Sequence, residues 1–344
     1  MTRYIIRRLL QAIPLLLIIS MVLFALMNKV GDPLATMGGR TVTRSEDRAR
    51  LAHQLGLDQP VACQYLYWLV GNDWHISGLH GFCNPDTPGT RKGVLRGDFG
   101  TSIVLVGKPV MQVIWERLPN TLILMVTSEI IIVLGSLVIG IYSALRQYSL
   151  IDNILTGISF VGYSMPIFFV ALVTMYIFAI DFKKWGLPYL PTVGMFDPSV
   201  GETPSQVIIH LILPVFSISF ISLAAYSRYI RSTMLEVLGQ DYIRTAKSKG
   251  LPKREIIFVH ALKNASLPIV TIVGLDLPLL LGGAVVTERI FAWPGMGRLF
   301  LDQVDRGDTP VVMGILMLIA VAVVVFQLFT DIAYAWLDPR IRYE

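Results

Sequence analysis

The chain has 344 residues and a formal net charge of +5 at neutral pH, with 54% apolar or aromatic residues and only 15% charged residues. The mean hydropathy is +0.62. A soluble domain of this length would carry more charge, so the composition excludes an ordinary soluble enzyme and indicates a protein of the lipid bilayer. Basic loops of a membrane protein account for the net charge, and no basic-aromatic motif indicates nucleic-acid binding.

Six apolar runs are long enough to cross about 30 Å of hydrocarbon, which takes about 20 helical residues. They lie at about 9–27, 118–145, 153–180, 207–226, 267–287 and 310–333. No cleavage signal follows the first run, so residues 1–27 are predicted to stay as an N-terminal anchor helix. Lys and Arg near the ends of spans are held on the cytoplasmic side of a membrane. They are concentrated in the short segments that are cytoplasmic when both termini lie inside. We therefore predict an all-α polytopic membrane protein with six transmembrane helices, N-in and C-in.

Residues 28–117 are predicted to form a helical extracytoplasmic subdomain. Ser45 can cap one helix, and Pro60 can open a second that runs through Tyr65 to Val70. Both cysteines, Cys63 and Cys83, fall in this outer segment, where the compartment is oxidising. This favours a disulfide between them, with two unpaired thiols as the alternative.

Residues 118–344 are predicted to form a five-helix core that contains a long loop, 227–266. Within it, residues 241–264 read as a helix ending at Gly250, a Leu251-Pro252 turn, and a second helix from Lys253 to Lys263. Apolar residues recur at helical spacing, at Ile243, Ala246, Ile256, Val259 and Leu262. This spacing favours docking on a partner over a solvated basic loop attracted to anionic lipid.

The motifs of ATP binding and hydrolytic catalysis do not occur in the chain. The only Gly-Lys pair, Gly107-Lys108, is followed by Pro109 instead of Ser or Thr, so there is no Walker A loop. We find no catalytic, cofactor-binding or metal-binding pattern. Any transport energy must come from a partner protein or from an ion gradient.

Three acidic residues fall within the predicted spans, where a charge is costly and usually faces a cavity or a partner. Asp331 lies near the inner end of the sixth span. The other two are Glu129 in the second span and Asp276 in the fifth. A place in a translocation path is one interpretation; a satisfied polar contact between helices, or a protonated acid, is the other. Pro166, Pro214 and Pro278 mark where spans can bend.

The charged segment 241–264 resembles the cytoplasmic loop of importer-type ABC permeases. Ala246, Gly250 and Leu262 stand in register with its pattern, whereas Arg244, Thr245, His260 and Lys263 depart from it in the manner of the dipeptide/oligopeptide branch. Gly162-Tyr163-Ser164-Met165-Pro166, Thr287 to Gly297, Arg117 to Thr121 and Ser232 to Leu238 also look like peptide permeases. Residues about 71–96 have no counterpart in the shorter members and are interpreted as an insertion.

The resemblance implies a permease of the type I ABC importer kind in the bacterial inner membrane. It would pair with a second, homologous permease, two cytoplasmic ATPases that bind the ATP and Mg, and an extracytoplasmic solute-binding protein. The resemblance assigns the ATPase-coupling loop to Asp241, Tyr242, Arg244, Thr245, Ala246, Lys247, Gly250, Leu251, His260 and Leu262. We predict that Glu129, Tyr163, Met165 and Asp276 line the translocation path.

A di- or oligopeptide is the first choice of substrate. Related permeases also carry nickel chelates, glutathione, opine-like compounds and oligosaccharides, and the binding protein largely selects among them. An ion-gradient-driven secondary carrier is the rival from another class, and the absence of an internal sequence repeat counts against it.

Overall fold

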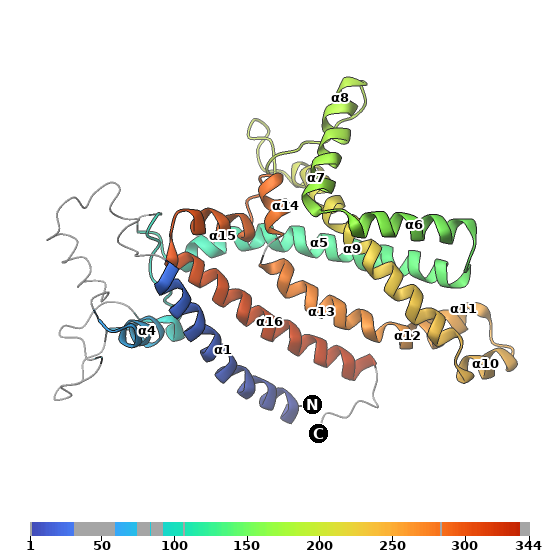
Figure 1. Cartoon of the computed structure of the whole chain (residues 1–344), viewed down its shortest axis with the longest axis horizontal. Helices are drawn as coiled ribbons and strands as arrows, with labels where there is room; N and C mark the ends of the chain where they lie inside the picture. Colours follow the sequence, from blue (N-terminus) through green and yellow to red (C-terminus); the bar gives the residue numbers. More distant parts are fainter. Residues whose placement is uncertain are drawn as a thin grey trace. The chain divides into compact units, whose positions relative to one another are not determined.

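The computed structural model describes residues 2–30, 59–73, 83, 92–105, 107–282 and 284–337, and in this part of the chain the regular structure is helical. The longer helices are α1 (Thr2–Val30), α4 (Val61–Val70), α5 (Val110–Leu145), α6 (Leu150–Ser164), α7 (Ile167–Met175), α9 (Pro204–Leu238), α10 (Asp241–Ser248), α13 (Leu267–Leu281), α15 (Met296–Asp305) and α16 (Thr309–Leu337) (Figure 1). The short pieces are η1 (Val94–Arg96), η2 (Tyr176–Asp181), α8 (Phe182–Lys184), α11 (Lys253–Glu255), η3 (Ile256–Ala261), α12 (Leu262–Ala265) and α14 (Val285–Ile290).

Five helical stretches are long and apolar enough to cross a membrane, and a bent pair of helices makes a possible sixth span. The five are Tyr4–Lys29, Val110–Leu145, Pro204–Leu238, Pro268–Ile290 and Thr309–Tyr334, each overlapping a predicted run. The all-α polytopic fold predicted from the sequence is therefore confirmed. At 1.5 Å per residue, α5 and α9 are each about 50 Å long, so both helices extend beyond the roughly 30 Å of hydrocarbon.

The third predicted span, 153–180, is not one straight helix. It consists of α6 and the stretch Ile167–Lys184, bent by 107° at a short break. The break contains Pro166, which has no N–H to continue the helix and disfavours a helical conformation in the residue before it, Met165. The prolines at 214 and 278 behave differently, because both lie inside helices that continue past them.

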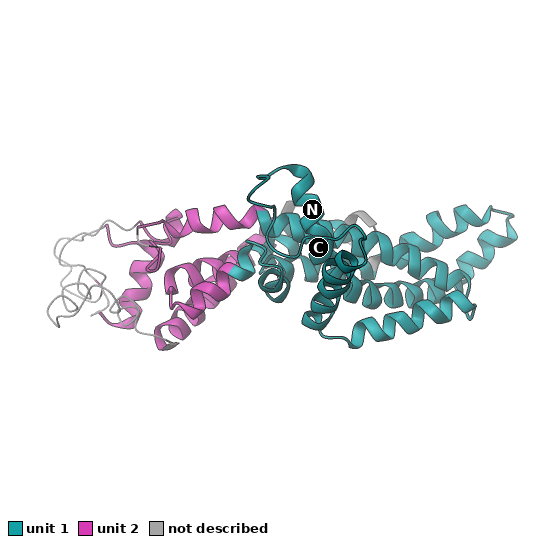
Figure 2. Cartoon of the chain, turned by 90° about the horizontal axis from the view of Figure 1, so that it is seen from above, with its two compact units in different colours: residues 1–5, 120–298, 322–344 teal, residues 6–119, 299–321 magenta. Residues whose placement is uncertain are grey.

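The chain divides into two compact units (Figure 2). Unit 1 comprises Met1–Ile5, Asn120–Arg298 and Ala322–Glu344, and unit 2 comprises Ile6–Pro119 and Leu299–Val321. Most of α1 and the start of α16 belong to unit 2. The sequence-based division at residues 27 and 117, which rests on membrane topology, stays a prediction.

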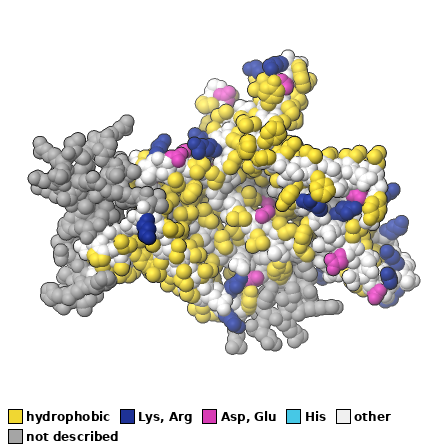
Figure 3. Space-filling model, in the orientation of Figure 1, with side chains coloured by type: hydrophobic (Ala, Val, Ile, Leu, Met, Phe, Trp, Pro, Cys, Tyr) yellow, Lys and Arg dark blue, Asp and Glu magenta, His cyan; other side chains and the backbone are white. Residues whose placement is uncertain are grey.

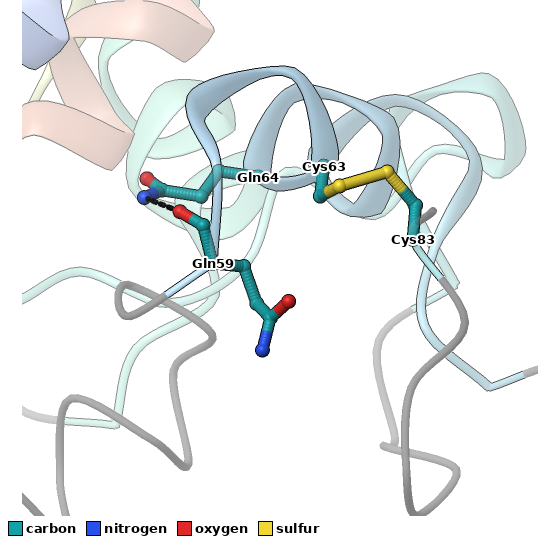
Figure 4. The surroundings of a disulfide bond; sticks show 4 residues. All are labelled: Gln59, Cys63, Gln64 and Cys83. Carbon is teal, nitrogen blue, oxygen red and sulfur yellow. Dashed lines mark hydrogen bonds between the residues drawn. A yellow bond between two sulfur atoms is a disulfide. The ribbon is translucent and has the colours of Figure 1, made fainter. Parts of the chain in front are cut away.

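In unit 2, the second predicted outer helix is confirmed as α4, which follows Pro60 and ends at Val70. The Cys63 and Cys83 side chains are joined by a disulfide, and the Gln64 amide beside it donates to the Gln59 carbonyl at 2.8 Å (Figure 4). The bond spans 20 residues, which corresponds to about 3 kcal/mol of stabilisation in the chain-entropy model. The helix predicted at Ser45 and most of the insertion 71–96 lie outside the described residues.

Two further sets of polar contacts join segments of unit 2 that are distant in the sequence. The Arg96 guanidinium donates to both carboxylate oxygens of Asp73, at 2.5 and 2.7 Å, and these bonds keep the pKa of Asp73 below its ordinary value. The buried Asp308 carboxylate accepts from the Ser102 hydroxyl and from the backbone N–H groups of Ile103 and Val104.

In unit 1, two of the motifs that resemble peptide permeases meet in a buried polar contact. The Glu288 carboxylate accepts from the Thr121 hydroxyl at 2.9 Å and from the Arg298 N–H at 2.9 Å. The indole N–H of the buried Trp293 donates to the Asn120 carbonyl. A Cβ at Gly295 would lie 2.4 Å from a Glu288 carboxylate oxygen, so only glycine fits there. These motif residues hold α5, α14 and the start of α15 together.

The acid near the C-terminal end of α16 also has a partner. Asp331 on α16 accepts a hydrogen bond from the Tyr4 hydroxyl of α1 at 2.8 Å, within unit 1.

Candidate functional site

The segment between α9 and α13 folds as the predicted helix, turn and second helix. The first helix, α10, ends at Ser248, and Gly250 follows with a left-handed φ of 76°. The Gly250 N–H donates to the Lys247 carbonyl, and the Leu251 N–H donates to the Ala246 carbonyl. These two bonds make a Schellman motif, in which glycine meets the left-handed position without a Cβ penalty. The second helix runs through α11, η3 and α12, with a π-helical middle at Ile256–Ala261.

The apolar stripe of this α10–α12 loop is buried inside unit 1. Ile243 has no exposed surface and packs with Ala246 and Ile256 in one cluster with Ile230 and Met234 of α9. Leu251 and Leu262 pack against the same cluster, whereas Val259 is exposed. The apolar residues whose helical spacing favours docking on a partner therefore pack mainly against the chain's own core.

The polar residues predicted for the coupling loop are on the outside of this packing. Asp241, Tyr242, Arg244, Thr245, Lys247 and Gly250 are exposed, and His260 is half-buried. Arg244 lies 3.5 Å from Asp241 in a fully solvated ion pair. Figure 3 shows Lys and Arg side chains gathered over the end of the molecule where α10 and α11 lie. The loop thus combines an exposed, basic outer face with a buried apolar base.

The two acids predicted for the translocation path meet at one hydroxyl. The Tyr226 hydroxyl of α9 donates to Asp276 of α13 at 2.6 Å and lies 3.4 Å from the near oxygen of Glu129 on α5. A phenol carries one proton, so the shorter contact takes it and the Glu129 contact is weak. Glu129 and Tyr226 are only 6% and 4% exposed. We call these three residues the acid cluster.

The acid cluster contains polar atoms without partners. The second carboxylate oxygen of Glu129 and the neighbouring Ser128 hydroxyl are buried and make no hydrogen bond to any described residue. Buried polar atoms are rarely left unpaired, and each lost bond costs about 1–3 kcal/mol. The Glu129 oxygen and the Ser128 hydroxyl can therefore each accept a further hydrogen bond.

The sequence did not single out Tyr226, because a tyrosine in an apolar helix is usually a packing residue. The available signal was its hydroxyl, which needs a partner when buried. The other two predicted path residues are not in the cluster. Met165 lies at the break between α6 and α7, and the exposed Tyr163 has the Arg228 guanidinium 4.9 Å from its ring centre.

The described residues contain no group of three or more His, Cys, Asp or Glu side chains that could hold a metal ion. The acid cluster has two carboxylates and a phenol, so it falls short of such a group.

Comparison with known proteins covers the whole chain. Residues 1–125 match the family described as "Binding-prot-dependent transport system membrane comp, N-term", and residues 136–343 match "Binding-protein-dependent transport system inner membrane component". The oligopeptide transport system permease protein AppB of Bacillus subtilis (strain 168) is 41% identical over 344 residues, covering 100% of both chains. The dipeptide transport system permease protein DppB of Escherichia coli (strain K12) is 35% identical, with both chains fully covered. A probable peptide ABC transporter permease protein, y4tP, of Sinorhizobium fredii is 36% identical over 99% of both chains. The chain is therefore a multi-pass membrane protein of the binding-protein-dependent transport system inner membrane component family.

Proposed function

We propose that this chain is the permease subunit of an ATP-driven importer of di- or oligopeptides. The observation that carries the proposal is full-length similarity, at 35–41% identity, to permeases named for oligopeptide and dipeptide transport. The proposed partners are a second permease, two ATPases that bind ATP and Mg, and an extracytoplasmic solute-binding protein. The acid cluster supports a peptide, because a peptide carries a cationic amino end and N–H donors.

The α10–α12 loop is the proposed contact for an ATPase. Its exposed polar face, including Arg244 and Thr245, would meet the partner, while Ile243 and Ala246 fix the loop to α9. A ligand-driven change requires differential contact in two states, so a loop that transmits motion must not deform. The Schellman turn and the buried stripe supply that rigidity.

One helix, α9, contributes residues to both the loop's core and the acid cluster. The same continuous helix, α9, carries Met234 in the loop's core and Tyr226 in the cluster. The two residues are about 12 Å apart along the helix at 1.5 Å per residue. A displacement of the loop would therefore move the Tyr226 hydroxyl relative to Glu129 and Asp276, changing what the acids can bind.

The test is reconstitution of the chain in proteoliposomes with and without the second permease, the ATPases and the binding protein. We expect uptake of a labelled dipeptide only with the complete set and ATP. Uptake driven by a proton or sodium gradient without ATPases would contradict the proposal and favour a secondary carrier. Uptake of a nickel chelate, glutathione or an oligosaccharide, with no peptide uptake, would support an ATP-driven permease but contradict a peptide substrate.

A further inference from the structure

A second polar site lies on α9, where it faces α6 instead of α13. A cavity of about 180 Å³ opens between α5, α6 and α9, and its lining includes Thr156, Ser159, Ser227, Arg228 and Arg231. Helices α6 and α9 run side by side over this stretch (Figure 1). The lining thus combines two guanidinium groups, on the part of α9 that follows the predicted span 207–226, with several hydroxyl groups.

The two arginines are not equivalent. Arg231 makes a two-pronged contact with the buried Asp152, at 3.0 and 2.9 Å, so its charge is neutralised. Arg228 has no hydrogen-bond acceptor or carboxylate among the residues that the structure describes, and its guanidinium lies over two rings, 5.1 Å from Phe160 and 4.9 Å from Tyr163. The cavity therefore carries one uncompensated positive charge.

Arg228 is half-buried, and a charge withdrawn from water is costly unless a partner offsets it. Ring contacts satisfy the flat faces of a guanidinium but not its N–H donors, which lie in the plane of the group. Those donors form a fork that matches the two oxygens of a carboxylate or phosphate. The hydroxyls of Thr156 and Ser159 line the same cavity and can add donors. At about 30 Å³ per water, the cavity has room for such a group with water around it.

We propose that this cavity binds an oxyanion through Arg228, with the terminal carboxylate of the transported peptide as the ligand. Identifying the ligand as a peptide rests on the proposed function. The phosphate of a lipid headgroup has the same chemistry and is the other source. With the acid cluster on a different face of α9, the permease would offer separate sites of opposite charge for the two ends of a zwitterionic peptide.

The test uses a cysteine reporter in the cavity, Ser159→Cys, in the complete transporter in nanodiscs. The native cysteines are joined as a disulfide and do not react. The readout is the ratio of labelling rates with an anionic and a cationic methanethiosulfonate of similar size. A positive cavity concentrates the anionic reagent, so we expect this ratio to fall about tenfold on Arg228→Gln. Arg228→Lys keeps the positive charge and should therefore keep most of this ratio.

The matched control is Lys183→Gln, which removes another cation that lies over an aromatic ring, Tyr189, at 5.3 Å. It should leave the ratio at position 159 unchanged. An equal ratio with and without the Arg228→Gln substitution would be inconsistent with the proposal, as would a reporter that neither reagent reaches. Thr156→Cys repeats the measurement should Ser159→Cys fail to assemble.

Protection experiments identify the source of the oxyanion. Slower labelling with alanyl-alanine, but not with its C-terminal amide, assigns the site to the substrate. Slower labelling with rising phosphatidylglycerol, whatever the peptide, assigns it to a headgroup. Protection by neither overturns the site. Labelling needs no transport, so a chain that fails to import peptide can still pass or fail this test on its own.

Discussion

The α10–α12 loop and the acid cluster are joined by α9 but are stabilised in opposite ways. In the loop, apolar side chains are buried and the polar groups at the end of α10 are satisfied by the Schellman motif. In the acid cluster, two carboxyl groups share one hydroxyl, and a Glu129 oxygen is buried without a partner. Buried apolar side chains and paired polar groups suit a part that must move as one body. Unsatisfied polar atoms suit a part that must take up and release a ligand.

The largest expected loss of stability follows Ile243→Ala, which empties the centre of the loop's core. Because Ile243 has no exposed surface, the cavity should cost about 2–4 kcal/mol. We expect faster hydrogen exchange across residues 253–265 and weaker coupling of ATP hydrolysis to uptake. Lys247→Ala, an exposed change on the same helix, is the control. Unchanged exchange in Ile243→Ala would mean that the loop does not depend on this packing.

Gly250→Val should break the rigid turn with a smaller cost. A non-glycine residue in the left-handed region costs about 1–2 kcal/mol, and a β-branched side chain is the least tolerated. We expect ATP hydrolysis without matching uptake and normal amounts of protein in the membrane. Gly250→Asn, which tolerates this conformation better, should keep most of the coupling. Normal coupled turnover in Gly250→Val would remove the turn from the mechanism.

Asp276→Asn separates the charge of the acid cluster from its geometry. The amide oxygen can still accept from Tyr226, so assembly should be intact while peptide uptake falls by about tenfold, the equivalent of about 1.4 kcal/mol. Tyr226→Phe keeps the ring packing but removes the shared hydroxyl, and should cost about 1–3 kcal/mol in stability. Loss of assembly in Asp276→Asn, before any loss of transport, would make the acid structural.

The smallest structural effect is expected for Arg244→Glu. The side chain is exposed, so the change in folding free energy should be within about 0.5 kcal/mol. A loss of coupling at normal stability would then report contact with a partner. Equal ATPase stimulation and uptake in the variant and the wild type would exclude Arg244 from that contact.

The sequence predicts best those features that depend on interactions between residues close together in the chain. The turn at Gly250 and the break at Pro166 depend on one or two neighbouring residues, so their local chemistry was enough. The acids at 129 and 276 could be singled out because a charge in a span is costly at any position. Their meeting at Tyr226 depends on how α5, α9 and α13 pack, and no local pattern encodes that. The burial of Ile243 against α9 was missed for the same reason, since an amphipathic stripe does not say what covers it.

ATPase action on the loop is expected to change access to the acid cluster through α9. The most direct measurement is labelling of Glu129→Cys and Asp276→Cys, each in a chain with Cys63 and Cys83 replaced by Ser, with a water-soluble thiol reagent. We predict that both sites react in at least one of the resting and ATP-trapped states of the complete transporter, at rates that differ between the states. Failure of both sites to react in either state would place them outside the translocation path and contradict the account.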